Sequence, residues 1–306
     1  MKRFSHFWWS LCFLFVFTTV YGQQQEHLII GRTTGELSLD GEKVRVFGFT
    51  NTLSGQVTLP GTTIDVRTGD RVVLDFWNIS QGNPHVIFMD SISLERRTKE
   101  GALAEEQAVY HMDHGYYHFT APAPGTYLYY CSENFPFNLQ AGMFGVMIVR
   151  SEVPVQPVRQ ELLWCSFELD LAWQELALLE TENGTEPNEP PVYDPEYFLL
   201  NGRPVKEVET LLSNAGESTE PVLLRLVNAG QWQHEISFPA AVKVQPVSAG
   251  KALPRTKRYQ QLILKPRETF ELLVYPTEGD KKYRVKYVFR DPVSERIKHR
   301  AFLSLY

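Results

Sequence analysis

Two sulfur-bearing residues stand close together near the middle of the chain. Cys131 ends the aromatic run Tyr127–Tyr130, and Met143 opens a β-rich run that continues to Val149. Because a strand, a loop and a second strand make a hairpin, this pattern would bring the cysteine and the methionine back together. A thiolate and a thioether are soft donors that suit copper. With imidazoles added, they would complete a mononuclear copper site in which the methionine is a distant axial ligand.

An imidazole precedes this hairpin in the chain. His85 follows Pro84 and precedes an apolar run, so it lies where a loop enters a strand. A histidine at such a place is, by itself, more often structural than a ligand. The ligand role for His85 is favoured by the family resemblance described next, which shows this hairpin at the same order and spacing.

The surrounding segments resemble the multicopper oxidases and the wider cupredoxin superfamily. APAPGTYLYYCSENFPFNLQAGMFGVMIV (121–149) is similar to the cysteine loop of that family, in which an HLEAGM-type ending stands where NLQAGM stands here. TLPGTTIDVRTGDRVVLDFWN (58–78) resembles the segment upstream of the first copper histidine, and His85 falls where that histidine lies. The resemblance is close over residues 45–150 and weaker in the second half, through YDPEYFLLNGRP and LLRLVNAGQWQHEISF.

This resemblance implies a type 1-like copper site in the first half of the chain. The family has histidine where this chain has Asn138, whose amide is a poorer donor or leaves a position open to water. The spacing from Cys131 to Asn138 is two residues longer than in the closest family pattern, which brings Glu133 into reach as a substitute. Loss of an imidazole weakens Cu(II) binding more than Cu(I) binding, because the remaining sulfur donors are soft. The predicted site holds at most one copper ion and consists of His85, Cys131, Asn138 and Met143.

A second, catalytic copper is not expected. Related oxidases and nitrite reductases carry further histidines soon after the first one and directly beside the cysteine. Here the corresponding positions hold Asp90, Tyr130 and Ser132, none of which replaces an imidazole well. By resemblance, His234 stands where the first ligand of a second domain would be. The final hairpin offers lysine and arginine in place of His-Cys-His, so we predict a metal-free second domain with a structural His234.

Other interpretations stay open at this point. The protein could be a metal-free scaffold for a partner or an envelope assembly, because fold resemblance does not carry function once site residues have changed. It could also be a copper-dependent oxidase or reductase. A disulfide between Cys131 and Cys165 would abolish any thiolate ligand. His114 and His118 would share one face of a strand and could bind a metal, although we expect an exposed aromatic-rich edge there.

The chain opens with the pattern of a secretory signal peptide. Met-Lys-Arg precedes an apolar run, Phe7–Val20, and a small-residue cleavage site follows before Gln23. The run is too short to span a membrane, so we expect a signal peptide at residues 1–22, no integral membrane span, and a secreted or periplasmic protein. Without Lys2 and Arg3, 28 basic residues face 36 acidic ones, a net charge of −8. No nucleic acid partner is expected, because no basic stripe is available to neutralise phosphates.

Short strands must position the candidate ligands. Apolar and polar residues alternate over much of the first half, and Asp40-Gly41 predicts a hairpin. Apart from weak helical character at 102–108, we find no convincing helical period there, and this predicts an antiparallel Greek-key sandwich. In the second half, a helix is expected within 169–180. Asn78 and Asn183 begin glycosylation patterns that matter only in a eukaryotic source.

The fold class predicted for the whole chain is all-β, with two Greek-key cupredoxin-like β-sandwich domains in tandem. The stretch SEVPVQPVRQ has two prolines and no period, which indicates a linker of limited flexibility. The predicted domains are therefore 23–150 and 161–306, with the linker at 151–160. A redox protein or an envelope protein is the expected partner. Two-domain relatives are commonly trimers, so the resemblance also implies a homotrimer.

Overall fold

The computed structural model describes residues 22–305 except 81, 83, 155, 177–190, 206–219, 255–256 and 276–282. Residues 1–21 of the predicted signal peptide and the glycosylation pattern at Asn183 lie outside the described residues. Within the described ranges, no helix is long and apolar enough to cross a membrane.

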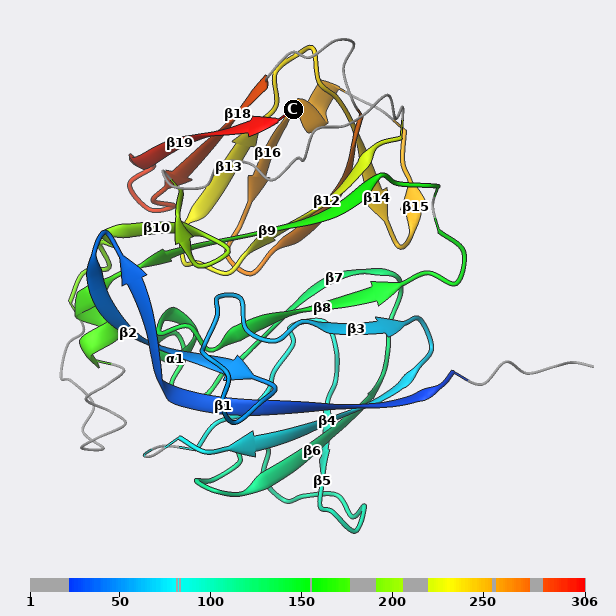
Figure 1. Cartoon of the computed structure of the whole chain (residues 1–306), viewed down its shortest axis with the longest axis vertical. Helices are drawn as coiled ribbons and strands as arrows, with labels where there is room; N and C mark the ends of the chain where they lie inside the picture. The colour runs from blue at the N-terminus through cyan, green and yellow to red at the C-terminus, as the bar shows by residue number, and fades with distance from the viewer. Residues whose placement is uncertain are drawn as a thin grey trace, which may run out of the picture.

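The regular elements in the first half of the chain are strands, with one short helix (Figure 1). They are β1 (Gln24–Leu39), β2 (Glu42–Thr50), β3 (Ile64–Arg67), β4 (Arg71–Asn78), β5 (Glu95–Arg97), β6 (His114–Thr120), β7 (Gly125–Tyr130) and β8 (Phe144–Arg150), with the short helix α1 (Phe137–Gln140) before β8. A five-stranded sheet has the order β2-β1-β4-β6-β5, and a three-stranded sheet has the order β3-β8-β7. We call these two sheets the first sandwich.

The second half repeats this plan with longer sheets. Its elements are β9 (Gln160–Leu169), β10 (Tyr197–Leu200), β11 (Arg203–Pro204), β12 (Val222–Asn228), β13 (Gln233–Ser237), β14 (Lys243–Ser248), β15 (Lys251–Ala252), the 3₁₀ helix η2 (Lys257–Gln260), β16 (Gln261–Leu264), β17 (Thr269–Tyr275), β18 (Tyr283–Arg290) and β19 (Ile297–Leu305). A seven-stranded sheet, β11-β10-β9-β12-β17-β14-β15, faces a four-stranded sheet, β16-β13-β18-β19. We call this the second sandwich.

Local sequence explains the first hairpin. Between β1 and β2, Asp40 and Gly41 have φ values of 53° and 90°. A two-residue hairpin turn requires this left-handed conformation at both positions, and the pair Asp-Gly readily adopts it. The hairpin predicted there is confirmed. The helical character predicted at 102–108 is wrong. Leu103 instead forms an isolated bridge with Arg97, because a weak local preference yields to pairing with a neighbouring strand.

The predicted all-β sandwich fold is confirmed, but the sheets are mixed, not purely antiparallel. β1 pairs in parallel with β4, β3 with β8, and β9 with β12. Alternation of apolar and polar residues shows which residues face a core and leaves the direction of pairing open.

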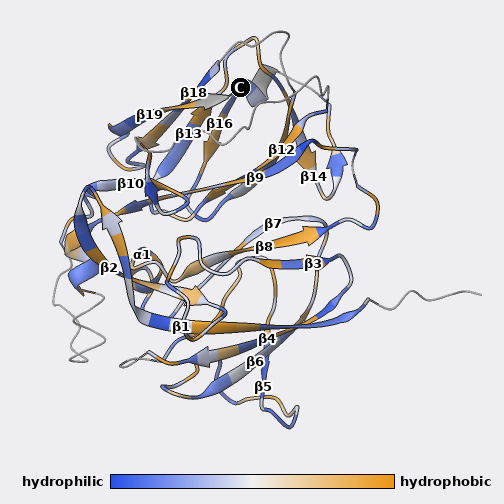
Figure 2. Cartoon of the chain, in the orientation of Figure 1, coloured by the Kyte–Doolittle hydropathy of each residue, from blue (hydrophilic) through white to orange (hydrophobic). Residues whose placement is uncertain are grey.

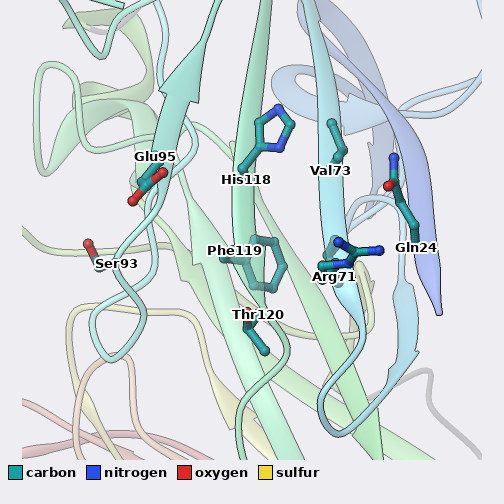
Figure 3. A pocket seen from close by; sticks show the side chains of 9 residues that line it. Gln24, Arg71, Val73, Ser93, Glu95, His118, Phe119 and Thr120 are labelled. Atoms are coloured by element: carbon teal, nitrogen blue, oxygen red, sulfur yellow. The ribbon is translucent and has the colours of Figure 1, made fainter. Parts of the chain in front are cut away.

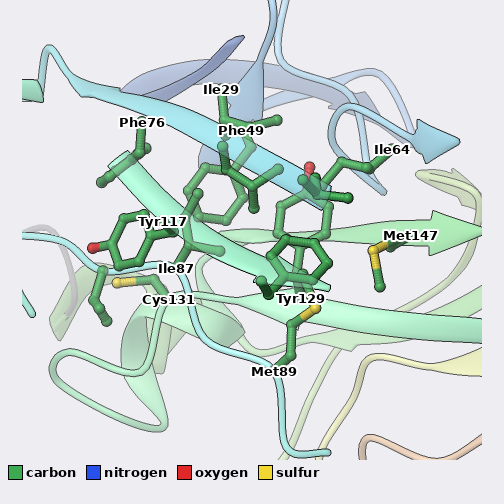
Figure 4. Packing of buried hydrophobic residues seen from close by; sticks show 14 of the residues in the cluster. Ile29, Phe49, Ile64, Phe76, Ile87, Met89, Tyr117, Tyr129, Cys131 and Met147 are labelled. Carbon is green, nitrogen blue, oxygen red and sulfur yellow. The ribbon is translucent and has the colours of Figure 1, made fainter. Parts of the chain in front are cut away.

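Buried apolar residues form three cores. One fills the first sandwich and includes Phe49, Phe76, Tyr117, Tyr129 and Cys131 (Figure 4). A second fills the second sandwich. The third, which we call the shared core, joins residues of both halves and includes Leu128, Leu139, Phe144, Cys165, Phe167 and Val227. β8, one of the most hydrophobic strands (Figure 2), belongs to the first core and the shared core.

A buried ion-pair network adds a polar contact between the sandwiches. The Arg225 guanidinium donates to Thr126 Oγ1 at 3.1 Å, to Glu161 Oε2 at 3.2 Å, and to Glu271. Thr126 belongs to β7 of the first sandwich, while the other three belong to the second. The shared core and this network hold the two sandwiches against each other.

The first strand of each sandwich forms a parallel pair that ends on a buried asparagine, β1 with β4 and β9 with β12. In the parallel pairs, Gly31 lies opposite Asn78, and Ser166 lies opposite Asn228. Each asparagine amide then donates to a main-chain carbonyl, Asn78 to Val109 at 2.8 Å and Asn228 to Trp232 at 2.7 Å. Asn78 is fully buried, so the folded chain does not offer it as a glycosylation site.

Candidate metal centre

Three of the four predicted ligand residues meet at one point inside the first sandwich. Cys131 Sγ lies 3.5 Å from His85 Nδ1. The Asn138 side-chain nitrogen lies 3.4 Å from the same Nδ1 and 3.5 Å from Sγ. The three atoms therefore form a nearly equilateral triangle. All three residues are buried.

Backbone hydrogen bonds hold each corner of this triangle. His85 forms an isolated bridge with Val109, N to O at 3.0 Å in one direction and 2.7 Å in the other. The Cys131 N–H donates to the Met143 carbonyl at 2.9 Å, and the Met143 N–H donates to the Asn138 carbonyl at 3.0 Å. We call residues 131–143 the ligand loop. These bonds close it, so its geometry is fixed before any side chain binds.

Gly142 makes the closure of the ligand loop sterically feasible. Its φ is +113°, and a Cβ there would stand 2.6 Å from the Phe47 carbonyl oxygen. Both the conformation and the close approach require glycine. The neighbouring Ala141 carbonyl accepts a hydrogen bond from Phe47 N–H at 2.7 Å. The loop is thus tied to β2 where it turns into β8.

Met143 follows the loop into the first core. Its methyl carbon lies 3.4 Å from the point where a Cβ on Gly31 would stand, and the Phe76 ring lies 2.9 Å from that point. The absence of a side chain at Gly31 thus leaves room for Met143 and Phe76. The structure joins Met143 to Cys131 and Asn138 through the main chain. Its role as an axial ligand stays a prediction.

Burial sets the protonation states of His85 and Cys131. Desolvation lowers the pKa of His85 to about 4 and raises the pKa of Cys131 to about 11. The imidazole is therefore neutral near pH 7, as a metal ligand must be. Hydrogen bonds from the Val86 backbone and the Asn138 amide oppose the rise for Cys131. Those donors would stabilise a thiolate, although without a cation the neutral thiol is favoured.

The triangle fits a metal ion. The centre of a triangle with edges of 3.4–3.5 Å lies about 2 Å from each corner, close to a metal–nitrogen bond length and slightly short of a metal–sulfur bond. The amide nitrogen and oxygen of Asn138 are interchangeable by a flip of the side chain, which would turn the oxygen toward the centre. A thiolate, an imidazole and an amide oxygen then converge as in trigonal copper sites.

Glu133 does not join this ligand set. Among the described residues there is no group of three or more His, Cys, Asp or Glu residues that could hold a metal ion. The Glu133 carbonyl lies 4.0 Å from Cys131 Sγ. The predicted disulfide alternative is not formed either, because Cys131 and Cys165 are both free.

The positions considered for a catalytic copper hold a different cluster. Tyr130 donates its phenol hydrogen to Asp90 Oδ1 at 2.9 Å, and Arg267 of the second sandwich donates to Asp90 Oδ2 at 3.1 Å. The Arg267 guanidinium also lies 5.1 Å from the centre of the Phe135 ring. Arg267 lies 177 residues from Asp90 along the chain, so no local sequence pattern indicates this contact.

His234 occupies the equivalent place in the second sandwich, and hydrogen bonds engage both of its ring nitrogens. Nδ1 lies 2.6 Å from Ser166 Oγ, and Nε2 lies 2.7 Å from Glu168 Oε2. Tyr287 donates to Ser166 Oγ at 2.7 Å, and the Trp232 N–H donates to Glu168 at 2.6 Å. This supports a structural His234. A hydrogen-bond network fills the place where the first sandwich has its cluster.

The histidines of β6 lie on the outer face of the five-stranded sheet. His114 Nδ1 contacts Asp75 Oδ1 at 2.6 Å, and its ring stacks on Trp77 with centroids 5.2 Å apart. His118 lines a shallow groove with Arg71 and Glu95 (Figure 3). The exposed aromatic-rich edge expected here is wrong, because β6 lies inside the five-stranded sheet, between β4 and β5. His114 and His118 have different surroundings on its outer face.

Comparisons with known proteins agree with this fold. Residues 39–153 match the family model described as multicopper oxidase. No curated protein sequence matches the chain significantly. The resemblance predicted from the cysteine loop and the segment upstream of His85 is thereby confirmed.

Several solved structures that superpose on this chain are described as copper proteins. A multicopper oxidase from Pseudomonas thermotolerans superposes with a TM-score of 0.65 at 18% identity, over 92% of this chain and 63% of that one. The copper nitrite reductase from Nitrosomonas europaea gives 0.65 at 16% identity, over 93% of this chain and 94% of that one. The blue copper oxidase from the same organism gives 0.64 at 18% identity, over 92% and 86%. The chain thus spans less than two thirds of the first structure and nearly all of the second. At such low identities the superpositions show the fold alone, which is cupredoxin-like in both halves of the chain.

Proposed function

We propose that this chain, a two-sandwich cupredoxin fold whose residues 39–153 match the multicopper oxidases, binds one copper ion in its first sandwich. The observation that carries the proposal is the buried triangle of Cys131 Sγ, His85 Nδ1 and the Asn138 amide, with edges of 3.4–3.5 Å. Each of these three buried groups carries polar atoms that need a partner, and one bound metal ion would serve all three at once.

Each residue would contribute one property. Cys131 would lose its proton and bind as thiolate, assisted by the backbone donor from Val86. His85, already neutral, would present Nδ1, and Asn138 would turn its oxygen inward. Met143 is the proposed axial donor. When bound, copper would supply a one-electron redox centre, and burial of the residues around it would exclude water.

Electron transfer or copper handling suits this site better than catalysis. Catalysis at a second copper needs an open metal position beside the first. At the corresponding positions, Tyr130 and Asp90 bond to each other and Asp90 pairs with Arg267. Those groups are already partnered, and none of them carries an imidazole or thiolate that would attract copper.

Metal analysis and visible absorption of the full mature protein test the proposal. We expect about one copper per chain in protein purified without added copper, and a strong visible band after copper loading that Cys131→Ser removes. Cys165→Ser is the matched control, because Cys165 is an equally buried free thiol outside the cluster. A band that survives Cys131→Ser, or that Cys165→Ser also removes, would contradict this assignment.

A metal-free scaffold is the second candidate, and one observation favours it. The Asn138 amide already donates toward both Sγ and Nδ1, so the triangle is satisfied by hydrogen bonds with thiol and imidazole neutral. Absence of copper under all loading conditions would support this candidate. Turnover of phenols, metal ions or nitrite in standard assays would instead support an oxidase or reductase.

We also propose that the protein is exported to the periplasm or the exterior, on the strength of its N-terminal apolar run and cleavage pattern. Its partner would then be a redox protein or an envelope protein. Size comparison of the precursor and the secreted chain tests the export.

A further inference from the structure

We propose that the second sandwich positions the Asn138 side chain, with Tyr193 and Trp173 as positioning residues that act through α1. This inference rests on the proposed copper site, since it names what fixes one of its corners. It concerns how two halves of the chain build one site, and its test includes a measurement that needs no metal.

The helix α1 cannot hold Asn138 in place alone. It has only four residues, and no side chain caps its N-terminus. Isolated helices of this length are unstable, because the cost of nucleation exceeds the gain from one or two hydrogen bonds. External contacts must therefore fix the orientation of α1.

The second sandwich supplies these contacts. The Tyr193 hydroxyl donates to Gln140 Oε1 at 2.8 Å. The rings of Phe137 and Trp173 lie 4.9 Å apart at 45°. Leu139 belongs to the shared core. Three of the four α1 residues thus contact the second half of the chain or the core it shares, and Asn138 is the one directed at His85 and Cys131.

Tyr193 is itself held firmly. Its ring packs against Trp173 at 4.7 Å and against Trp232 at 5.7 Å between centroids. Its hydroxyl lies 3.3 Å from the Glu168 carbonyl, in the strand whose side chains engage His234. Burial and the nearby carboxylates raise the pKa of Tyr193 well above its usual range, so the phenol remains a hydrogen-bond donor.

Removal of the Tyr193 hydroxyl would leave the Gln140 amide unpaired. Gln140 is fully buried, and its Nε2 already lacks a hydrogen-bond partner among the described residues. With Oε1 also unpaired, the amide loses its only side-chain hydrogen bond among the described residues, and a buried unpaired polar group is destabilising. Reorientation of α1 toward water would relieve that cost. Asn138 would move with it, because the two residues share one helical turn.

The test uses full-length mature protein with Cys165→Ser, so that Cys131 is the single thiol. Tyr193→Phe is compared with Tyr287→Phe, a matched control that deletes a phenol oxygen from the same sandwich, where it bonds to Ser166. The first readout is the labelling rate of Cys131 by a thiol reagent in metal-free protein, alongside global stability from urea unfolding. Trp173→Leu provides a second variant that loosens α1 through the Phe137 contact.

We expect Tyr193→Phe and Trp173→Leu to raise Cys131 labelling about tenfold, as loss of about 1.4 kcal/mol in local closure implies. Tyr287→Phe should raise the labelling rate of Cys131 only by the amount that its loss of global stability accounts for. In copper-loaded samples, only Tyr193→Phe and Trp173→Leu should shift the visible band. Equal labelling in all variants at matched global stability would overturn the positioning role.

The two proposals can fail separately. If the parent protein binds no copper while Tyr193→Phe still exposes Cys131 selectively, the copper site is wrong and the positioning role stands. If copper binds and neither the band nor the labelling responds to Tyr193→Phe and Trp173→Leu, the positioning role is wrong and the copper site stands.

Discussion

At the scale of single residues, the exclusion of water governs the chemistry of the cluster. His85 and Cys131 are fully buried, and burial moves the pKa of the first down to about 4 and of the second up to about 11. Both groups are therefore neutral near pH 7 in metal-free protein. A cation bound between them would favour the thiolate and lower the pKa of Cys131, so copper binding should release one proton.

The titration of His85 predicts an acid-sensitive stability. Its pKa is lower in the folded chain than the ordinary value of 6.5, so the unfolded chain binds more protons between pH 6.5 and 4. The free energy of unfolding of metal-free protein should therefore fall by about 3 kcal/mol as the pH drops through this window. Urea unfolding at pH 7 and pH 4 measures it. Over the same pH range, the free energy of unfolding of His85→Gln should fall by about 3 kcal/mol less than that of the wild type. Equal losses in the two proteins would contradict the assignment of this titration to His85.

Asn138 offers the sharpest test of the ligand set. Asn138→His restores an imidazole at the third corner of the triangle, which should deepen the visible colour of a copper-loaded sample and strengthen retention of Cu(II) against a chelator by at least tenfold, about 1.4 kcal/mol. Asn51→His is the control, because Asn51 is exposed and lies outside the cluster. If Asn138→His, even combined with a shortened ligand loop, binds no copper, the loop is not a copper site.

The sequence predicted the residues of the cluster well and their surroundings poorly. His85, Cys131 and Asn138 meet because one hairpin and one adjacent loop bring them together. Such short connections can be predicted from a single sequence. Met143 is placed beside them through the main chain. Arg267 and Glu168 could not be anticipated, since their contacts with Asp90 and His234 join segments with no local pattern in common.

At the scale of elements, the ligand loop depends on one glycine. Gly142→Ala would place a Cβ 2.6 Å from the Phe47 carbonyl at φ +113°. We expect a loss of about 2–4 kcal/mol in the free energy of unfolding and no retained copper, because backbone strain and a clash add together. Gly101→Ala is the matched control. It also has a positive φ, +88°, with nothing within 4 Å of its Cβ, and should cost only about 1 kcal/mol.

Thermal unfolding of Gly142→Ala and Gly101→Ala, with copper content measured on the same samples, provides the comparison. Equal destabilisation by the two substitutions would show that the Phe47 contact plays no part. Retention of copper by a folded Gly142→Ala protein would show that the site tolerates a displaced loop.

The strands were predictable because apolar alternation marks them, whereas α1 was not. Four residues span barely one turn, too few to show a helical period. The helix expected within 169–180 is present over 171–176, and the remaining residues of that prediction lie outside the described part of the chain. The ligand loop therefore needed the structure to reveal that a helix, and not extended chain, carries Asn138.

At the scale of the whole molecule, the shared core makes the two sandwiches one unit. Phe144 of β8 and Phe167 of β9 pack with ring centroids 5.0 Å apart, and residues of both halves surround them. Alternation of apolar and polar residues shows which face of a strand packs against a core. β8 is buried on both faces and shows no such alternation. The sequence therefore could not show that its second face covers the other half of the chain. The boundaries at 150 and 161 stay predictions.

This shared core predicts cooperative unfolding. Calorimetry of the metal-free protein should give a single transition for both sandwiches, and Phe167→Ala should destabilise both by about 3–5 kcal/mol because it leaves a cavity in the common core. Phe302→Ala, at a site 49% exposed on β19, is the control and should cost under about 1 kcal/mol. Two separate transitions in the wild type would mean that the sandwiches fold independently.

Copper K-edge X-ray absorption of the loaded, full-length protein tests the central claim most directly. The account predicts one sulfur scatterer at about 2.2–2.3 Å with one imidazole, and loss of that sulfur in Cys131→Ser while Cys165→Ser leaves it in place. A spectrum with only nitrogen and oxygen neighbours, unchanged by Cys131→Ser, would contradict it.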